Sequence, residues 1–363
     1  MLSKRENYLR AADFKYPEYI PAVISVFWPV WNTYREKLEE VAERYPMLFP
    51  GFKKGSVKYE GALGPVYTDE LVEDPFGCVW RFNIKGYQGQ VVKHPLENWA
   101  RWREYSLPDP DAGLPVEGAR DLVPWEQVYE WMDVAEENGD PVVAPMPHGF
   151  FFQRLYYLRG FRNLLKDFVL KQPQIYELIE ELTEYNLRLV EHLLKHPRVD
   201  VVSFGDDLGT QTAMPISPRT FREFIYPAYK EIFSYSRERG ARVRLHTDGH
   251  VMEVADQLLE AGVNILNIQD RVNGLVNIER ELKGRVCIDL DIDRQHLIPY
   301  GTPAKIRDYV KEVVRKLGSL KGGLMLYAEV HPPTPLENIE ALAQALSESI
   351  WLSESGRRAQ RSS

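Results

Sequence analysis

The chain has 363 residues, of which 44% are hydrophobic and 27% charged, a balance that supports a sizeable core and argues against global disorder. Its formal net charge of -8 argues against nucleic acid or an anionic membrane as the main partner. Two cysteines, Cys78 and Cys287, exclude a disulfide framework and fit a reducing, cytoplasmic location. No apolar run reaches the roughly 18 residues of a membrane span, and the first residues lack an apolar secretory core.

The first 140 residues predict short strands, a helix and loops rather than a regular alternation. Proline and glycine set the limits of most of these elements. They are a buried strand over 22–28, a helix over 33–42, a hairpin over 76–93 with Gly86 near its turn, and a proline-rich loop over 106–111. A regular rhythm is absent from this part, so it is interpreted as an extension that precedes the main sheet.

From residue 141 onward, predicted strands and helices alternate. The strands are expected over 141–145, 199–204, 241–246, 264–268, 285–290 and 323–328, and the helices over 151–170, 173–196, 217 onward, 251–261, 302–317 and 334–350. Ser217 before Pro218, and Thr302 before Pro303, are typical of an N-cap followed by the first helical position. Such alternation indicates a parallel sheet.

The number of these units predicts the fold class. Seven or so strand–helix units in one chain favour an α/β fold, a single (β/α)8 barrel with an N-terminal extension and hairpin. The barrel is expected over 1–352, with residues 1–140 as the N-terminal part and a frayed tail over 353–363. A doubly wound open sheet is the alternative, disfavoured because no Gly-x-Gly-x-x-Gly follows an early strand.

Two adjacent carboxylates follow the strand that ends at Phe204. Catalytic groups of barrel enzymes gather at the carboxyl ends of the strands, so Asp206 and Asp207 are predicted catalytic residues and Gln211 a substrate ligand. Adjacent carboxylates repel, and at least one of them needs a cation, a hydrogen-bond donor or a raised pKa. The alternative is that one aspartate caps a turn and the other is solvated.

The next strand ends in His246 and Asp248. Positions two apart on an extended segment face the same way, and an imidazole beside a carboxylate can bind a divalent metal. His246 is also a predicted catalytic residue. A third metal ligand is expected at Glu329 or His331, after a later strand. The alternative for His246 and Asp248 is a hydrogen-bonded pair that only orders the loop.

Three further strand ends carry predicted substrate ligands, namely Gln269, Asp291 and His148.

Two common catalytic classes are disfavoured. No Gly-x-Ser-x-Gly is present, which argues against an α/β-hydrolase, and no Gly-Lys-Ser/Thr is present, which argues against a P-loop NTPase.

Four segments, taken in this order, resemble motifs of one family. They are Asp206-Asp207-Leu208-Gly209-Thr210-Gln211 followed by Ile216-Ser217-Pro218, then Leu245–Gly249, then Asp291–Gln295 followed by Gly301-Thr302-Pro303, and last Pro333–Ile339. The chain resembles the uroporphyrinogen decarboxylase superfamily, which also contains cobalamin-dependent methyltransferases. The likeness is strongest over 141–352, and it implies the (β/α)8 barrel that the alternation also predicts.

Departures from the family motifs bear on the activity. Nothing after Val30 matches the Arg-Gln-Ala-Gly-Arg segment with which decarboxylases of the family hold their substrate, which argues against that activity. The methyltransferases bind zinc through His-x-Cys and a distal Cys. Here His246 matches, Asp248 stands at the first cysteine, and Glu329 lies closest to the second. This harder ligand set is better suited to polarising an oxygen; it implies zinc, another divalent ion or no metal.

The resemblance implies a cytoplasmic enzyme, most simply a methyltransferase that acts on a small molecule and works with a corrinoid carried by a partner protein. It also implies a homodimer. One alternative is a decarboxylase, of a tetrapyrrole or another substrate, that uses no metal. The other is a barrel without activity that serves as a partner in a corrinoid complex.

Overall fold

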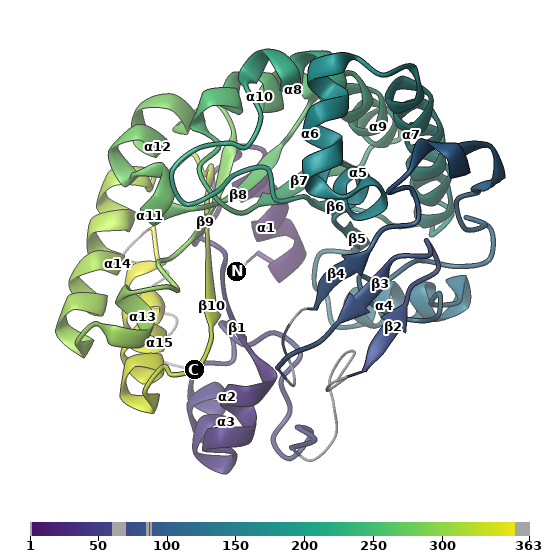
Figure 1. The fold of residues 1–363 in the computed structure, drawn as a ribbon. Helices are drawn as coiled ribbons and strands as arrows, with labels where there is room; N and C mark the ends of the chain where they lie inside the picture. Colours follow the sequence, from purple (N-terminus) through teal and green to yellow (C-terminus); the bar gives the residue numbers. More distant parts are fainter. Residues whose placement is uncertain (1, 60–69, 85–86, 88, 353–363) are drawn as a thin grey trace. The chain divides into compact units, whose positions relative to one another are not determined.

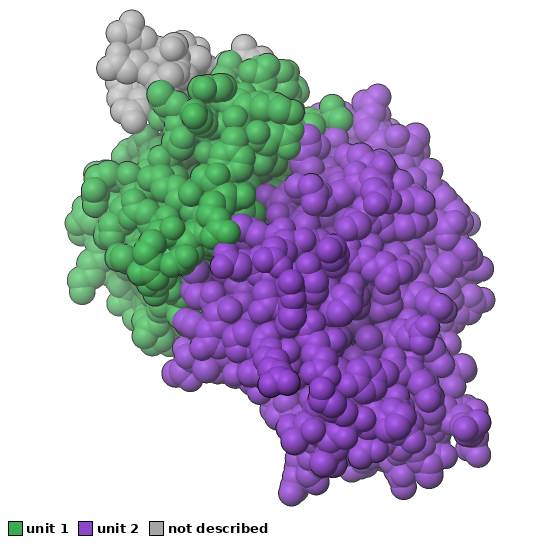
Figure 2. Space-filling view, turned by 90° about the horizontal axis from the view of Figure 1, so that it is seen from above, with its two compact units in different colours: residues 1–64, 265–363 green, residues 65–264 purple. Residues whose placement is uncertain are grey.

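The computed structural model describes residues 2–59, 70–84, 87 and 89–352, and the predicted tail and Gly86 lie outside these. The chain divides into two compact units (Figure 2), here called the terminal unit, residues 1–64 and 265–363, and the central unit, residues 65–264. Each unit combines parallel strands with helices, so the predicted α/β class is confirmed. None of the helices in the described part of the chain has the length and apolar character needed to span a lipid bilayer.

The terminal unit contains four parallel strands in the order β1-β10-β9-β8 (Figure 1). The strands are β1 (Ala22–Val26), β8 (Ile265–Gln269), β9 (Cys287–Asp291) and β10 (Leu324–Val330). Its helices are α1 (Lys4–Ala12), α2 (Trp28–Tyr34), α3 (Glu36–Arg44), α11 (Asp270–Asn273), α12 (Leu275–Leu282), α13 (Leu297–Tyr300), α14 (Pro303–Leu317) and α15 (Leu336–Ser349). Every residue of β8 and β9 is buried, as expected for parallel strands that are covered on both faces.

The central unit contains three parallel strands in the order β5-β6-β7 and a separate antiparallel sheet in the order β2-β3-β4. The strands are β2 (Leu71–Glu73), β3 (Val79–Arg81), β4 (Gln90–Lys93), β5 (Val143–His148), β6 (Val201–Gly205) and β7 (Arg242–Thr247). Its helices are α4 (Trp125–Glu137), α5 (Phe152–Arg159), α6 (Phe161–Leu170), α7 (Pro173–Leu193), α8 (Pro218–Phe224), α9 (Tyr226–Glu238) and α10 (Ala255–Ala261), with 3-10 turns η1 (Trp99–Glu104) and η2 (Met252–Val254).

The strand count tests the predicted barrel only in part. Seven parallel strands occur in the described ranges, four in the terminal unit and three in the central unit, and an eighth is not found there. The antiparallel pairing of β3 with β4 confirms the hairpin expected within residues 76–93. Closure into one eight-stranded barrel stays a prediction.

Two predicted helix starts are confirmed by their capping contacts. Ser217 Oγ accepts a hydrogen bond from the amide of Thr220 at 3.1 Å, and Pro218 opens α8. Thr302 Oγ1 accepts from the amide of Lys305 at 3.3 Å in the same way. These side chains satisfy amides that have no partner inside the helix, which fixes where each helix begins.

Three predicted helices are each interrupted. The helix expected over 151–170 is two helices, α5 and α6, because the chain passes through Gly160 with φ 80°. The helix expected over 33–42 is also two, since Arg35 has φ 49°. The helix from residue 217 ends at Phe224, and α9 restarts with Pro227 in its first turn.

A buried ion pair ties the antiparallel sheet to α5. Asp74 accepts hydrogen bonds from the amides of Phe76 (3.0 Å) and Cys78 (2.9 Å) and from Trp80 Nε1 (2.8 Å). Arg154 Nη1 of α5 lies 3.4 Å from Asp74 Oδ2, and both side chains are only 2% exposed. The guanidinium also lies 3.9 Å from the centre of the Phe76 ring. The segment inserted before β5 is therefore held by a charged contact that water does not reach.

Candidate functional site

Two histidines are brought together by the register of three parallel strands in the central unit. His148 of β5 pairs with Gly205 of β6, and Gly205 pairs in turn with His246 of β7. A β-carbon at Gly205 would lie 2.6 Å from His148 Cδ2, so the glycine leaves room for that imidazole. The two ring centres are 5.6 Å apart. The end of this sheet therefore presents two imidazoles side by side.

Asp207 completes a set of three potential metal ligands. One ligand atom each from His148, Asp207 and His246 lies within 4.8 Å of the others. Asp207 Oδ1 is 3.5 Å from His148 Nε2 and 3.7 Å from His246 Nε2, and Asp248 Oδ1 is 3.6 Å from His246 Nε2. These four side chains are between 20% and 32% exposed, so a ligand can reach them.

Asp207 is held in place from two directions. Its Oδ1 accepts a hydrogen bond from the amide of Asp248 at 3.1 Å. Its Oδ2 accepts from Gln153 Nε2 at 3.1 Å, and Gln153 Oε1 accepts from the amide of Asp207 at 2.9 Å. Gln153 was not predicted to belong to the site, because it stands inside a largely apolar helical segment. The carboxylate is thus oriented before any ligand binds.

Asp206 has a different environment from Asp207. It is fully buried, and it accepts hydrogen bonds from the amides of Phe152 (2.5 Å) and Gln153 (2.8 Å) and from the hydroxyl of Tyr229 (2.7 Å). Burial raises its pKa to about 6 in spite of these donors. This arrangement favours the alternative that Asp206 is a capping residue. Its carboxylate accepts from the first amides of α5 and so fixes the position of Gln153.

His148 and Asp207 shift each other's pKa. Burial disfavours a charged His148, but its hydrogen bonds to Asp207 and Glu117 outweigh that effect and raise its pKa to about 11. Burial would raise the pKa of Asp207, but the hydrogen bond from His148 lowers it. At neutral pH the two side chains therefore carry opposite charges, and a metal that binds His148 must displace a proton.

The loops after β6 and β7 cross at two glycines. The amide of Gly209 donates to the carbonyl of Asp248 at 3.1 Å, and the amide of His250 donates to the carbonyl of Thr210 at 2.7 Å. Gly249 has φ 83°, and a β-carbon on it would lie within 3.0 Å of backbone atoms of Gly209. The crossing fixes Asp207 and Asp248, which stand next to it.

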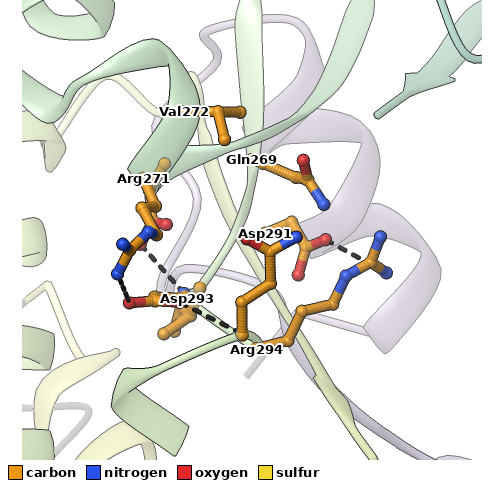
Figure 3. Close-up of a pocket in the computed structure, with 9 residues that line it drawn as sticks. Gln269, Arg271, Val272, Asp291, Asp293 and Arg294 are labelled. Atoms are coloured by element: carbon orange, nitrogen blue, oxygen red, sulfur yellow. Dashed lines mark hydrogen bonds and ion pairs between the residues drawn. The ribbon is translucent and has the colours of Figure 1, made fainter. Parts of the chain in front are cut away.

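Other predicted residues lie in the terminal unit, around a small pocket at the ends of β8 and β9 (Figure 3). Gln269 and Asp291 line it together with Arg294, and the empty space measures about 180 Å³, part of it open to solvent. Arg294 Nη1 lies 3.4 Å from Asp291 Oδ2 and also pairs with Glu329. His331 Nε2 is 2.9 Å from Glu329 Oε2. The predicted ligand Glu329 is therefore engaged with an arginine and a histidine of its own unit.

Gln211 is exposed, in a bend after β6, and no contact of its side chain supports the predicted role. Besides Gln153, two further residues around His148 and Asp207 were missed, Glu117 and Tyr157. Glu117 lies in an irregular loop, where no periodicity marks it, and Tyr157 stands in an aromatic run of α5 that is typical of a core.

Asp270, in the pocket of the terminal unit, is expected to make the stability of the protein depend on pH. Its Oδ2 accepts from Tyr309 Oη at 2.7 Å and from the amide of Asp293 at 3.1 Å. Burial, and then the charge of Asp293, raise its pKa from 3.8 to about 7. Because the folded protein holds this proton more tightly than the unfolded chain, stability falls as the pH rises from about 4 to about 7.

We expect Asp270→Asn, which cannot ionise, to remove that fall. Relative to wild type, its free energy of unfolding should rise by about 3 kcal/mol between pH 4 and pH 8. Urea titrations at both pH values measure this, with the exposed Asp308→Asn on α14 as the control. Parallel curves for Asp270→Asn and wild type would show that Asp270 does not carry the effect.

The family model of uroporphyrinogen decarboxylase (URO-D) matches residues 149–349. A methyltransferase from Methanosarcina mazei has the same fold, with a TM-score of 0.64 and 17% identity over 96% of this chain and 99% of that one. Xylanase 10B from Thermotoga maritima gives a TM-score of 0.42 at 14% identity over 96% and 98% of the two chains, too weak a likeness to support any inference. No curated protein sequence matches the chain.

Proposed function

The chain belongs to the uroporphyrinogen decarboxylase (URO-D) family, and on this premise we propose that it is an enzyme of metal-assisted methyl transfer. The methyl group would pass between a small molecule and a corrinoid carried by a partner protein. The shared fold with a methyltransferase from Methanosarcina mazei supports this choice within the family. The proposal includes closure of the parallel strands into the eight-stranded barrel that the resemblance implies.

One observation carries the proposal, the convergence of His148, Asp207 and His246. Two imidazole nitrogens and one carboxylate oxygen are a donor set that fits zinc or another divalent ion. Asp248 lies close enough to His246 to approach the same ion after a small side-chain movement. The proposed ligands are therefore these three residues, with Asp248 beside them.

Side chains of the site orient the proposed ligands before an ion binds. Gln153 fixes the Asp207 carboxylate, so that its Oδ1 faces both imidazoles. In the absence of the ion, His148 and Asp207 hold a proton between Nε2 and Oδ1, and an ion that binds Nε2 would displace it. A bound divalent ion would act as a Lewis acid on an oxygen or a thiol of the substrate. With no thiolate among the ligands, the site favours an oxygen.

Metal content and methyl transfer test the proposal. Purified protein is expected to hold about one divalent ion per chain, and His246→Ala and His148→Ala to lose it. Demethylation of methylcobalamin by an added thiol or alcohol, followed by visible absorption, should fall at least about 100-fold in both variants. His296→Ala, which replaces a histidine that is 57% exposed, is the matched control and should behave as wild type.

A metal-independent decarboxylase is the alternative, and the protonated state of His148 favours it, since an imidazolium can donate a proton without a metal. Wild-type protein that holds no divalent ion, or variants that keep the ion and the full rate of transfer, would contradict the methyl-transfer proposal. Release of carbon dioxide by metal-depleted protein would then support the alternative.

A further inference from the structure

Glu117 contacts the ring nitrogen of His148 that points away from the other two ligands. His148 Nδ1 donates to Glu117 Oε2 at 3.2 Å, while His148 Nε2 faces Asp207 Oδ1 at 3.5 Å. The Glu117 side chain is only 10% exposed. One imidazole thus lies between two carboxylates, one on the ligand side and one behind the ring.

The loop that carries Glu117 is anchored on both sides. Leu114 and Val123 exchange two backbone hydrogen bonds, each 2.8 Å long, and they close the loop at its base. Gly118 has φ 68°, and a β-carbon on it would lie 2.8 Å from the ring of Phe82, so the backbone next to Glu117 packs directly on the antiparallel sheet. Glu117 is therefore a fixed partner of His148, because its backbone is held independently of the ligand residues.

Glu117 also belongs to a closed ring of side-chain contacts. Its Oε1 accepts from Tyr157 Oη at 2.5 Å, and Gln153 Nε2 donates both to Tyr157 Oη at 3.1 Å and to Asp207 Oδ2 at 3.1 Å. Asp207 leads back to His148. Burial raises the pKa of Tyr157, so its hydroxyl keeps the proton that it donates to Glu117. Every donor in the ring faces an acceptor.

A carboxylate behind a histidine determines which nitrogen can bind a metal. When Nδ1–H donates to Glu117, the lone pair of the neutral ring is on Nε2, which faces Asp207 and lies next to His246. We propose that Glu117 is the positioning residue that makes His148 a metal ligand through Nε2. This inference rests on the proposed function, since it needs a metal at the site.

The test measures the affinity for Zn²⁺ by competition with a coloured chelator. Glu117→Ala removes the acceptor and should weaken zinc binding about 10- to 100-fold. Glu117→Gln keeps a neutral oxygen acceptor and should lose less, and so should Tyr157→Phe, which leaves the contact between Glu117 and His148 in place. Glu126→Gln changes an exposed glutamate of α4 and is the matched control, with unchanged affinity.

A spectroscopic readout separates positioning from a general structural effect. In the zinc-loaded wild type, the nitrogen-15 NMR spectrum should show a protonated Nδ1 and a metal-bound Nε2 for His148, and Glu117→Ala should lose this fixed assignment. Zinc that binds wild type and Glu117→Ala equally well overturns the inference but leaves the proposed function standing. Wild type that binds neither zinc nor another divalent ion overturns both. If Glu117→Ala does not fold, Glu117→Met decides, because methionine fills the same space without an oxygen acceptor. Unchanged zinc affinity with unchanged His148 signals in that variant overturns the inference.

Discussion

Replacing Gly249 with alanine is expected to unfold the crossing of the β6 and β7 loops and to abolish the metal site. The new β-carbon would lie within 3.0 Å of backbone atoms of Gly209, and no rotation of a side chain can relieve a contact between two backbones. The residue would also stand at φ 83°, which L-residues rarely adopt. We expect a loss of more than about 4 kcal/mol in the free energy of unfolding.

Gly240→Ala is the matched control for this experiment. Its φ of 87° is almost the same as that of Gly249, but a β-carbon there meets nothing within 4 Å. Its free energy of unfolding should therefore fall by only about 1 kcal/mol, the cost of placing an alanine in this left-handed backbone conformation. Urea unfolding and zinc content measure both variants. Equal losses in the two would mean that the close approach of Gly209 and Gly249 is unimportant and that only the backbone conformation matters.

Asp74→Ala is expected to give the second-largest effect. The substitution leaves the guanidinium of Arg154 buried without its carboxylate, and it removes the acceptor of three further hydrogen bonds. Breaking a buried ion pair in this way costs about 3–5 kcal/mol. Arg154 also lies 5.4 Å from the ring centre of Tyr157, so we expect the variant to weaken zinc binding as well.

The double variant Asp74→Ala/Arg154→Met tests the reason for this loss. Because methionine brings no charge into the core, the double variant should be more stable than Asp74→Ala alone. Glu6→Ala is the control, since it breaks an ion pair whose side chains are 39% and 48% exposed, and it should change stability by less than about 1 kcal/mol. A double variant less stable than Asp74→Ala would show that the unpaired charge is not the cause.

Local sequence signals predicted the elements well where one residue decides the outcome. Ser217 and Thr302 marked helix starts correctly, because capping depends only on neighbours three residues away. The interruptions at Gly160 and Arg35 were missed, since hydrophobic periodicity continues across both and only the backbone angles reveal them. The helix α4 was missed as well, although its buried face has helical spacing.

The sequence pointed to the residues of the proposed metal site one by one, but it did not predict that they lie together. His148, Asp207 and His246 were all named from their places at strand ends, but His148 was assigned to the substrate and Asp207 to catalysis. A strand end tells which way a side chain points, whereas the partners that it meets depend on the register between strands. Glu117 could not be found, because its contact joins a loop and a strand end 31 positions apart.

The region that matches the family begins at residue 149, just after His148 and well after Glu117, whereas Asp207 and His246 lie inside it. The site therefore combines residues inside the matched region with residues of the segment that precedes it. An exchange of residues 113–148 would therefore change Glu117 and His148 together and leave Asp207 and His246 in place.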